Sequence, residues 1–233
     1  MAEDQKPPKR VYGRRTGRPL NKSRTAALDE LLPVLQIPAA DLTEQGDLPP
    51  QTLFNRPTLS FWLEVGFGNG EHLAAQMEAH PDRAYLGAEP FANGMAAFLK
   101  AIKDKPHNNV RVLMDDAMMI ANSLSDGCLD GIYILNPDPW HKKRHHKRRI
   151  VNRTNLDQFA RILKPGGRLI MSTDVPALAE WMVTEASIHP AFTWTATNAA
   201  DWHTPPPGWI KTRYEEKGAK GADRMSYLIF LRK

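Results

Sequence analysis

A carboxylate fixed between two prolines is the residue in this sequence best placed to do chemistry. The segment reads Asn136-Pro137-Asp138-Pro139-Trp140, and it follows the apolar run 129–135, whose pattern predicts a buried strand. The prolines end that strand and fix the backbone on both sides of Asp138. Residues 141–149 are then all Lys, Arg or His. An acid beside so many cations indicates a reaction on a polyanionic partner.

A glycine-rich segment offers a second candidate site. Glu64 is followed by Gly66, Gly68 and Gly70, which come after the apolar run 59–65 and before a predicted helix. Glycines at such a turn allow positive φ angles and let the backbone approach a ligand closely. Dinucleotide sites use G-x-G-x-x-G to seat a pyrophosphate on the helix N-terminus. The G-x-G-x-G spacing and the flanking acids Glu64 and Glu71 instead favour a cationic ligand, with a plain tight turn as the alternative.

Alternating strands and helices must position these two segments. Apolar patterns predict strands at 59–65, 84–88, 110–114, 129–135 and 168–172, and helices at 71–79, 94–105, 156–163 and 176–187. A turn is expected at 164–167, and late strands at 192–197 and 226–231 would add an antiparallel edge. This alternation predicts an α/β fold with a doubly wound, mostly parallel, Rossmann-like sheet of seven strands.

The chain before residue 58 has a different character. Residues 1–24 hold eight cations and no apolar periodicity, which predicts a disordered basic tail. Residues 25–35 predict a short helix that Pro33 ends near Leu32, and the proline-rich stretch 36–57 predicts a wandering connection. We therefore expect a basic tail with a connecting segment at 1–57 and one domain at 58–233.

Acids stand where the predicted strands end. In doubly wound sheets, ligands bind beyond the carboxyl ends of the strands. Each of the first five strands leads to such an acid: Glu64, Glu89, Asp116, Asp138 and Asp174. Any one of them could be an ordinary exposed acid at a strand end. Five together predict a ligand site at this edge of the sheet.

Composition and charge limit the class of protein. The 233 residues are 42% hydrophobic and 24% charged, as in a soluble globular protein, and no apolar run is long enough to span a membrane. The N-terminus has no secretory apolar region, and the single cysteine cannot form an internal disulfide, so a cytoplasmic protein is expected. No Cys/His spacing predicts a metal site. The net charge of +5 becomes −9 without the eight cations of residues 1–24 and the six of 142–149, which is typical of phosphate-backbone binding.

The glycine loop resembles the first motif of the class I S-adenosylmethionine-dependent methyltransferases. The resemblance implies S-adenosylmethionine as the cofactor and S-adenosylhomocysteine as its product. It further implies that Glu64 and the backbone of Gly66, Gly68 and Gly70 face the methionine end. Glu89 then matches the acid that accepts from both ribose hydroxyls, and Asp116 matches the residue that accepts from the adenine amine.

The proline-rich segment narrows the acceptor. Amino-methyltransferases carry a four-residue N/D-P-P-aromatic motif at this strand end, and here Asp138 is inserted between the prolines. The segment resembles the PDPW motif of the tRNA (guanine-N7-)-methyltransferases. The resemblance extends through residues 142–149, Ser172-Thr173-Asp174, and Thr212-Arg213-Tyr214-Glu215. The sequence departs from the family pattern in two places. Asn136 stands where the family often has an aromatic residue, and residues 221–227 lack the usual G-H-G-x-W-D ending.

This family resemblance implies roles for particular residues. Asp138 is the expected catalytic residue and also borders the cofactor. Substrate contacts are implied for Lys142, Asp174, Thr212, Arg213, Tyr214 and Glu215. RNA contacts are implied for Arg144, His145, His146, Lys147, Arg148 and Arg149. Asp174 could also cap the helix predicted from residue 176, a role compatible with substrate contact. Trp140 could stack on a base or be a packing anchor.

The implied reaction is methyl transfer to N7 of a guanine in the variable loop of tRNA. N7 carries a free lone pair, so no base has to remove a proton, and a rigid carboxylate would orient the guanine and stabilise the cationic product. The alternatives are a methyltransferase acting on an exocyclic amine and a non-catalytic RNA-binding protein. A dinucleotide oxidoreductase fits the glycine spacing worst. Both a monomer and a homodimer remain open.

Overall fold

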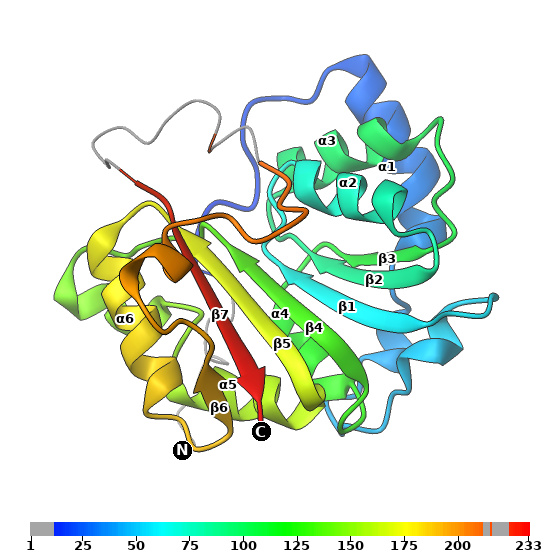
Figure 1. Ribbon diagram of the computed structural model, residues 1–233. Coiled ribbons are helices and arrows are strands. Elements are labelled where there is room, and N and C mark those ends of the chain that lie inside the picture. Colours follow the sequence, from blue (N-terminus) through cyan, green and yellow to red (C-terminus); the bar gives the residue numbers. More distant parts are fainter. Residues whose placement is uncertain (1–11, 212–214, 216–223) are drawn as a thin grey trace, which may run out of the picture.

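The computed structural model describes residues 12–211, 215 and 224–233. Seven strands form one sheet in the order β3-β2-β1-β4-β5-β7-β6 (Figure 1). Neighbouring strands from β3 to β5 run parallel, and β7 is antiparallel to both β5 and β6. The strands are β1 (Ser60–Val65), β2 (Arg83–Ala88), β3 (Val110–Leu113), β4 (Leu129–Leu135), β5 (Leu163–Thr173), β6 (Phe192–Trp194) and β7 (Ser226–Arg232). The predicted mostly parallel seven-stranded sheet with an antiparallel edge is confirmed.

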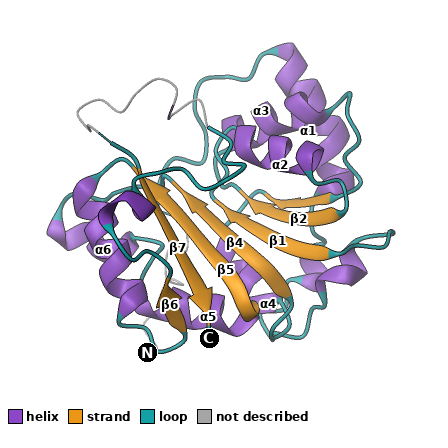
Figure 2. Ribbon diagram, in the orientation of Figure 1, coloured by secondary structure: helices purple, strands orange, loops and turns teal. Residues whose placement is uncertain are grey.

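Helices cover both faces of this sheet (Figure 2). The α-helices are α1 (Lys22–Leu35), α2 (Glu71–Ala79), α3 (Ala92–Ile102), α4 (Ala117–Ser123), α5 (Arg153–Ile162) and α6 (Pro176–Ser187). Short 3-10 helices are η1 (Ala39–Asp41), η2 (Pro50–Leu53), η3 (Lys143–Arg148) and η4 (Ala199–Trp202).

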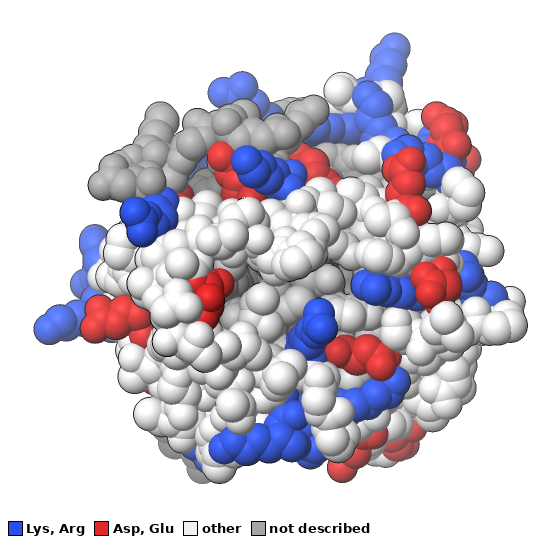
Figure 3. All heavy atoms as spheres, viewed as in Figure 1, with Lys and Arg blue, Asp and Glu red and all other residues white. Residues whose placement is uncertain are grey.

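Alternation along the strands separates two cores. Side chains such as Trp62, Tyr85 and Tyr133 pack with α1, α2 and α3, whereas Leu63 and Ile132 pack with α4, α5 and α6. Successive strand residues point to opposite faces, so each strand contributes to both cores. In Figure 3 the charged side chains on the face in view form scattered groups of both signs.

The predicted elements agree closely with the structure, with a few corrections. The bounds of α2, β4 and α6 are as predicted. Helix α1 does not end before Pro33 as predicted but continues to Leu35, so that this proline lies within the last turn. Burial of Leu31 and Leu35 on either side of the proline stabilises this last turn. The expected turn at 164–167 is part of β5, which begins at Leu163 opposite Leu129 across a register shift. Helix α4 was not predicted, since its seven residues are too few for a periodic signal.

Residues 12–57 pack against the sheet domain. Helix α1 lies against α3, and the Ile37 N–H donates to the Val112 carbonyl at 2.9 Å. The Leu48 N–H donates to the Ser123 carbonyl, also at 2.9 Å. The prediction of disorder is therefore wrong for residues 12–24, which have a defined conformation, while residues 1–11 lie outside the described part of the chain.

Candidate active site

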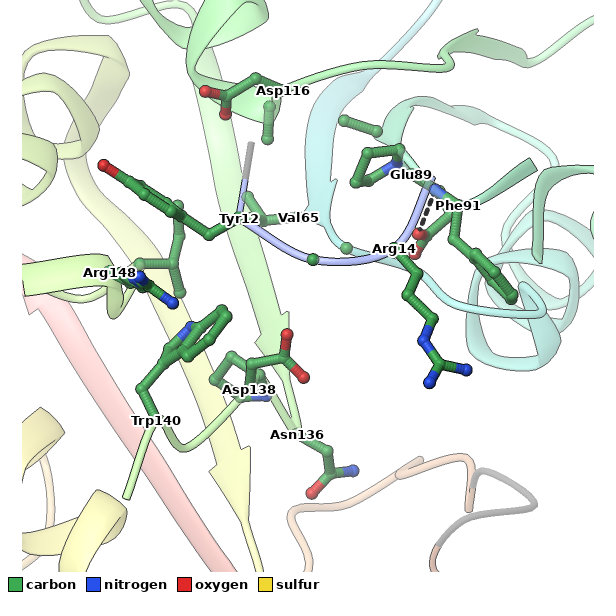
Figure 4. A pocket seen from close by; sticks show the side chains of 17 residues that line it. Tyr12, Arg14, Val65, Glu89, Phe91, Asp116, Asn136, Asp138, Trp140 and Arg148 are labelled. Atoms are coloured by element: carbon green, nitrogen blue, oxygen red, sulfur yellow. Dashed lines mark hydrogen bonds between the residues drawn. The ribbon is translucent and has the colours of Figure 1, made fainter. Parts of the chain in front are cut away.

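A cavity of about 460 Å³ lies at the carboxyl ends of β1, β2 and β4. Its walls come from the glycine loop, the end of β2, the start of α4, the proline-rich segment and an N-terminal segment (Figure 4). Of the predicted site residues, five line it: Gly66, Glu89, Asp116, Asp138 and Arg148. The volume is within the range of small-molecule sites.

The glycine loop has the backbone that its composition predicts. Gly66, Gly68 and Gly70 have φ angles of 68°, 58° and 76°, which side-chain-bearing residues rarely adopt. A Cβ on Gly70 would lie 2.3 Å from the Phe98 ring, so this glycine also permits close packing of α3. A Cβ on Gly66 or Gly68 would meet nothing within 4 Å, which leaves open space beside the loop. The loop therefore exposes its backbone, but only Gly66 lines the cavity.

Glu89 ties the glycine loop to α3. Its Oε2 accepts from the Gly68 N–H at 2.7 Å, and its Oε1 accepts from the Phe91 N–H at 2.9 Å (Figure 4). Burial raises the pKa of this carboxyl group, and the two N–H donors only partly oppose that shift. A carboxylate has about four lone-pair positions, so Glu89 can accept from two further hydroxyls in the cavity.

Glu64 does not line the cavity, and its side chain is engaged by the protein. It is buried, and its Oε2 lies 2.8 Å from His72 Nδ1. His72 Nε2 is 3.4 Å from the amide nitrogen of Gln76, and the His72 ring packs edge-on against Tyr133. The sequence gives no signal for this role of His72, because the eight residues that separate it from Glu64 include a loop and so have no single period. This pair joins the end of β1 to α2, and Glu64 is not among the residues that line the cavity.

Asp116 lies at the cavity and also begins α4. Its Oδ1 accepts from the Met118 N–H at 3.0 Å, so the side chain caps the helix. The neighbouring Asp115 pairs with Arg15. Both acids lie at the end of β3, as the strand pattern predicts.

The proline-rich segment projects Asp138 into the cavity (Figure 4). Asn136 and Trp140 at its two ends have φ angles of 49° and 42°. Non-glycine residues held in this left-handed region cost of order 1–3 kcal/mol each, which is a cost typical of functional sites. The surrounding protein raises the pKa of Asp138 by desolvation, although part of its side chain reaches solvent. Asn136 Oδ1 is buried and has no hydrogen-bond partner among the described residues.

The basic segment has two distinct sides. Residues Lys143–Arg148 form η3, and residues three apart lie on the same side of a 3-10 helix. Arg144 and Lys147 are exposed, as is Lys142 before the helix. His145 and Arg148 instead contact Trp140, with the Arg148 guanidinium 4.9 Å from the ring centroid.

The burial of Arg149 disagrees with its predicted contact to RNA. It is buried, its Nε donates to the Pro139 carbonyl at 2.9 Å, and its guanidinium lies 4.8 Å from the Trp181 ring centroid. Burial lowers the pKa of this guanidinium. Arg149 therefore supports the proline-rich segment from inside. His146 is partly buried against the same Trp181 ring.

The remaining predicted substrate residues are only partly described. Thr212, Arg213 and Tyr214 lie outside the described residues. Glu215 accepts from the Trp209 indole N–H at 2.9 Å, and burial raises its pKa. Asp174 is buried after β5, and α6 has Val175 as its N-cap residue. Asp174 is therefore not the N-cap residue of α6, and the Val175 N–H donates to Thr173 Oγ1 at 3.1 Å.

The cavity fits the cofactor that the sequence implies. Gly66 gives an open backbone wall, Glu89 keeps free lone pairs, and Asp116 adds an acceptor at the other side. A sulfonium ligand without phosphate suits a site lined by three carboxylates. Within the described ranges, no cluster of His, Cys, Asp or Glu could hold a metal ion, and no helix could cross a membrane.

Strand order and site together define a class I methyltransferase. Solved structures of the same fold include an antibiotic-related methyltransferase (17% identity, TM-score 0.52, covering 76% of this chain and 89% of that one). Another is the 16S rRNA methyltransferase KamB (15% identity, TM-score 0.54, covering 76% and 90%). At these identities the likeness shows the fold alone. The family described as "Putative methyltransferase" matches residues 59–227.

Curated relatives define the family more narrowly. The tRNA (guanine-N(7)-)-methyltransferase of Rhodospirillum rubrum is 43% identical over 224 residues, covering 96% of this chain and 88% of that protein. The protein of the same name from Rhizobium meliloti is 42% identical over 221 residues, covering 95% and 94%. The chain belongs to the tRNA (guanine-N(7)-)-methyltransferase family, as its PDPW segment predicts.

Proposed function

We propose that this enzyme transfers the methyl group of S-adenosylmethionine to N7 of a guanine in the variable loop of tRNA. The observation that carries the proposal is the position of Asp138. Its carboxylate enters the same cavity as Gly66 and Glu89, and Pro137 and Pro139 hold it in place. The names of the family relatives support the substrate, and the location in the variable loop rests on the resemblance of the sequence motifs.

Cofactor binding would use the groups at the ends of β1, β2 and β3. Glu89 would accept from ribose hydroxyls, Asp116 from the adenine amine, and the Gly66 backbone would border the methionine end. When bound, the sulfonium supplies an electrophilic methyl group. The protein's contribution is to hold the acceptor nitrogen in line with that methyl group, which is catalysis by positioning.

Asp138 would orient the guanine and balance its charge. The N7 lone pair is free at neutral pH, so the transfer needs no proton acceptor. The methylated base gains a positive charge, which a nearby fixed carboxylate stabilises. Partial desolvation raises the pKa of Asp138, and a base bound over the exposed part of this side chain would shield the carboxylate further and strengthen its interaction with a cation. The carboxylate can also accept hydrogen bonds from the N–H groups of the base.

Lys142, Arg144 and Lys147 would hold the RNA backbone. All three are exposed, and they immediately follow the segment that carries Asp138. Phosphate contacts position a nucleic acid without reading its bases. The same loop thereby sets the distance from the backbone contacts to the methyl acceptor.

The test is methylation of tRNA with methyl-labelled S-adenosylmethionine, followed by chemical cleavage at 7-methylguanine. Wild-type protein is expected to label one variable-loop guanine. Asp138→Asn should lose about 100-fold or more in kcat while retaining the fold, and Asp104→Asn, an exposed acid remote from the cavity, should behave as wild type. Label on an exocyclic amine, or full turnover by Asp138→Asn, would refute the proposal.

A further inference from the structure

One wall of the cavity comes from the N-terminal end of the chain. Residues 12–18, called here the N-terminal strap, cross the cavity, and Tyr12, Gly13 and Arg14 line it. In Figure 4 the strap runs from Tyr12, which lies near Arg148 and Trp140, to Arg14 near Glu89. A Cβ on Gly13 would lie 4.0 Å from Asp138 Oδ2, so the strap backbone also packs beside the catalytic carboxylate.

The strap is fastened by hydrogen bonds from the start of α3. Asn93 Oδ1 accepts from the Gly17 N–H at 2.7 Å, and Asn93 Nδ2 donates to the Arg18 carbonyl at 2.7 Å. The Ala92 N–H donates to the Arg15 carbonyl at 2.9 Å, and the Arg15 side chain pairs with Asp115. These bonds join backbone groups that no strand or helix would otherwise satisfy.

The Asn93 side chain is committed to the strap. Among the described residues, both hydrogen bonds of its side chain go to the strap. It stands two residues after Phe91, whose N–H donates to Glu89. The residue that binds the strap thus lies four residues after Glu89, the acid expected to hold the ribose.

Gly17 lets the strap pack closely on the start of α3. A Cβ on Gly17 would lie 2.8 Å from Phe91 Cζ and 3.0 Å from Asn93 Oδ1, so the Phe91 ring, the Asn93 amide or the strap would have to shift. Phe91 lines the cavity, so the strap packs directly on a wall residue. Substitution of Gly17 would displace the strap without removing any charge.

The other end of the strap contacts the basic segment. The Arg148 guanidinium lies 5.0 Å from the Tyr12 ring centroid and 4.9 Å from that of Trp140, and the two rings meet edge to face with centroids 6.4 Å apart. Such cation–π contacts contribute more when they are partly shielded from water. The strap is thereby anchored at both sides of the cavity.

We propose that the N-terminal strap is part of the cofactor site, and that Asn93 is a positioning residue that fastens it over bound cofactor. This inference rests on the proposed use of S-adenosylmethionine. The cavity of about 460 Å³ exists with the strap in place, so the strap forms a wall around the ligand space. Fastening raises the fraction of molecules that hold a complete site, and the apparent affinity rises with that fraction.

The experiment measures binding and release of S-adenosylhomocysteine by calorimetry and stopped flow, with the full-length protein. Each hydrogen bond is worth a factor of roughly three to ten, so Asn93→Ala should weaken binding at least about tenfold and speed release similarly. Gly17→Ala and Arg15→Ala should act in the same direction. Matched controls are Asn108→Ala, an exposed asparagine before β3, and Lys22→Ala, which removes the same charge outside the strap.

Melting temperatures should stay within about 2 °C of wild type, because these side chains are exposed or partly buried. Bound S-adenosylhomocysteine should also slow tryptic cleavage after Arg14 and Arg15 in wild type but not in Asn93→Ala. Unchanged affinity in Asn93→Ala would overturn the inference, as would tighter binding, which would make the strap an obstruction. Failure of the wild type itself to bind S-adenosylhomocysteine would refute the proposed function instead.

Discussion

The buried pair of Glu64 and His72 is predicted to stabilise the glycine loop. Both side chains are almost completely buried, and their polar atoms lie 2.8 Å apart. His72→Leu keeps a similar volume on α2 but leaves the Glu64 carboxylate buried without its partner. We therefore expect a large loss of stability from a change that touches no residue of the cavity wall.

The size of that loss follows from the burial. Leaving a buried carboxylate without its partner costs about 3–5 kcal/mol. For a chain of this length, each kcal/mol corresponds to about 2–4 °C in melting temperature. His72→Leu should therefore lower the melting temperature by roughly 6–20 °C. Glu64→Gln should cost less, because the amide oxygen can still accept from the imidazole.

A double-mutant cycle separates the pair from its surroundings. The free energy of unfolding would be measured by urea denaturation for wild type, Glu64→Gln, His72→Leu and the double variant. The double variant should be more stable than the sum of the single losses predicts, by at least about 1 kcal/mol. His107→Leu, on a surface loop, is the matched control. A loss under 1 kcal/mol in His72→Leu, or strict additivity, would refute the reasoning.

Further predictions concern the cavity acid and the basic segment. Glu89→Ala removes the acceptor of two N–H groups and should weaken S-adenosylhomocysteine binding about 100-fold by calorimetry, and equal affinity would contradict the assignment. Because the folded-state pKa of Glu89 is raised, its contribution to stability falls as pH rises through the interval above its ordinary value, and Glu89→Gln should flatten that part of the stability–pH curve. Arg144→Ala with Lys147→Ala should weaken tRNA binding and reduce its salt slope, with melting temperature unchanged. Arg149→Ala should instead lower the melting temperature, and a loss of tRNA affinity without destabilisation would show that this arginine does reach RNA.

The sequence predicts the sheet and the position of the site because both depend on local patterns. Strand and helix periods are visible in short windows, and strand-end acids follow from the fold. The bounds of α2, β4 and α6 were accordingly predicted to the residue. The same reasoning placed Glu89, Asp116 and Asp138 at one edge, where they do line one cavity.

What the sequence could not predict depends on contacts between distant segments. Asn93 and Gly17 are 76 residues apart, and neither belongs to a recognisable motif. The strap residues have the composition of a disordered tail. Their order comes instead from backbone groups bonded to α3 and from one ion pair, neither of which leaves a pattern in the sequence. Glu64 likewise matches a cofactor motif, yet the loop turns its side chain inward to His72.

The basic segment shows why composition alone misassigns roles. A run of nine cationic or titratable residues has no apolar pattern, so each residue appears equally available to a phosphate. The 3-10 helix separates these residues into different sides, because residues three apart lie on the same side. Arg144 and Lys147 therefore face outward, whereas His145 and Arg148 contact Trp140. A phosphate bound to Arg144 and Lys147 would contact the same short helix that packs on Trp140 from its other side. Trp140 lines the cavity together with Asp138 and the strap. We therefore predict that the effect of Asn93→Ala on S-adenosylhomocysteine release shrinks when saturating tRNA holds the basic segment in place, because Arg148 contacts both the strap and Trp140. An equal effect with and without tRNA would contradict this link.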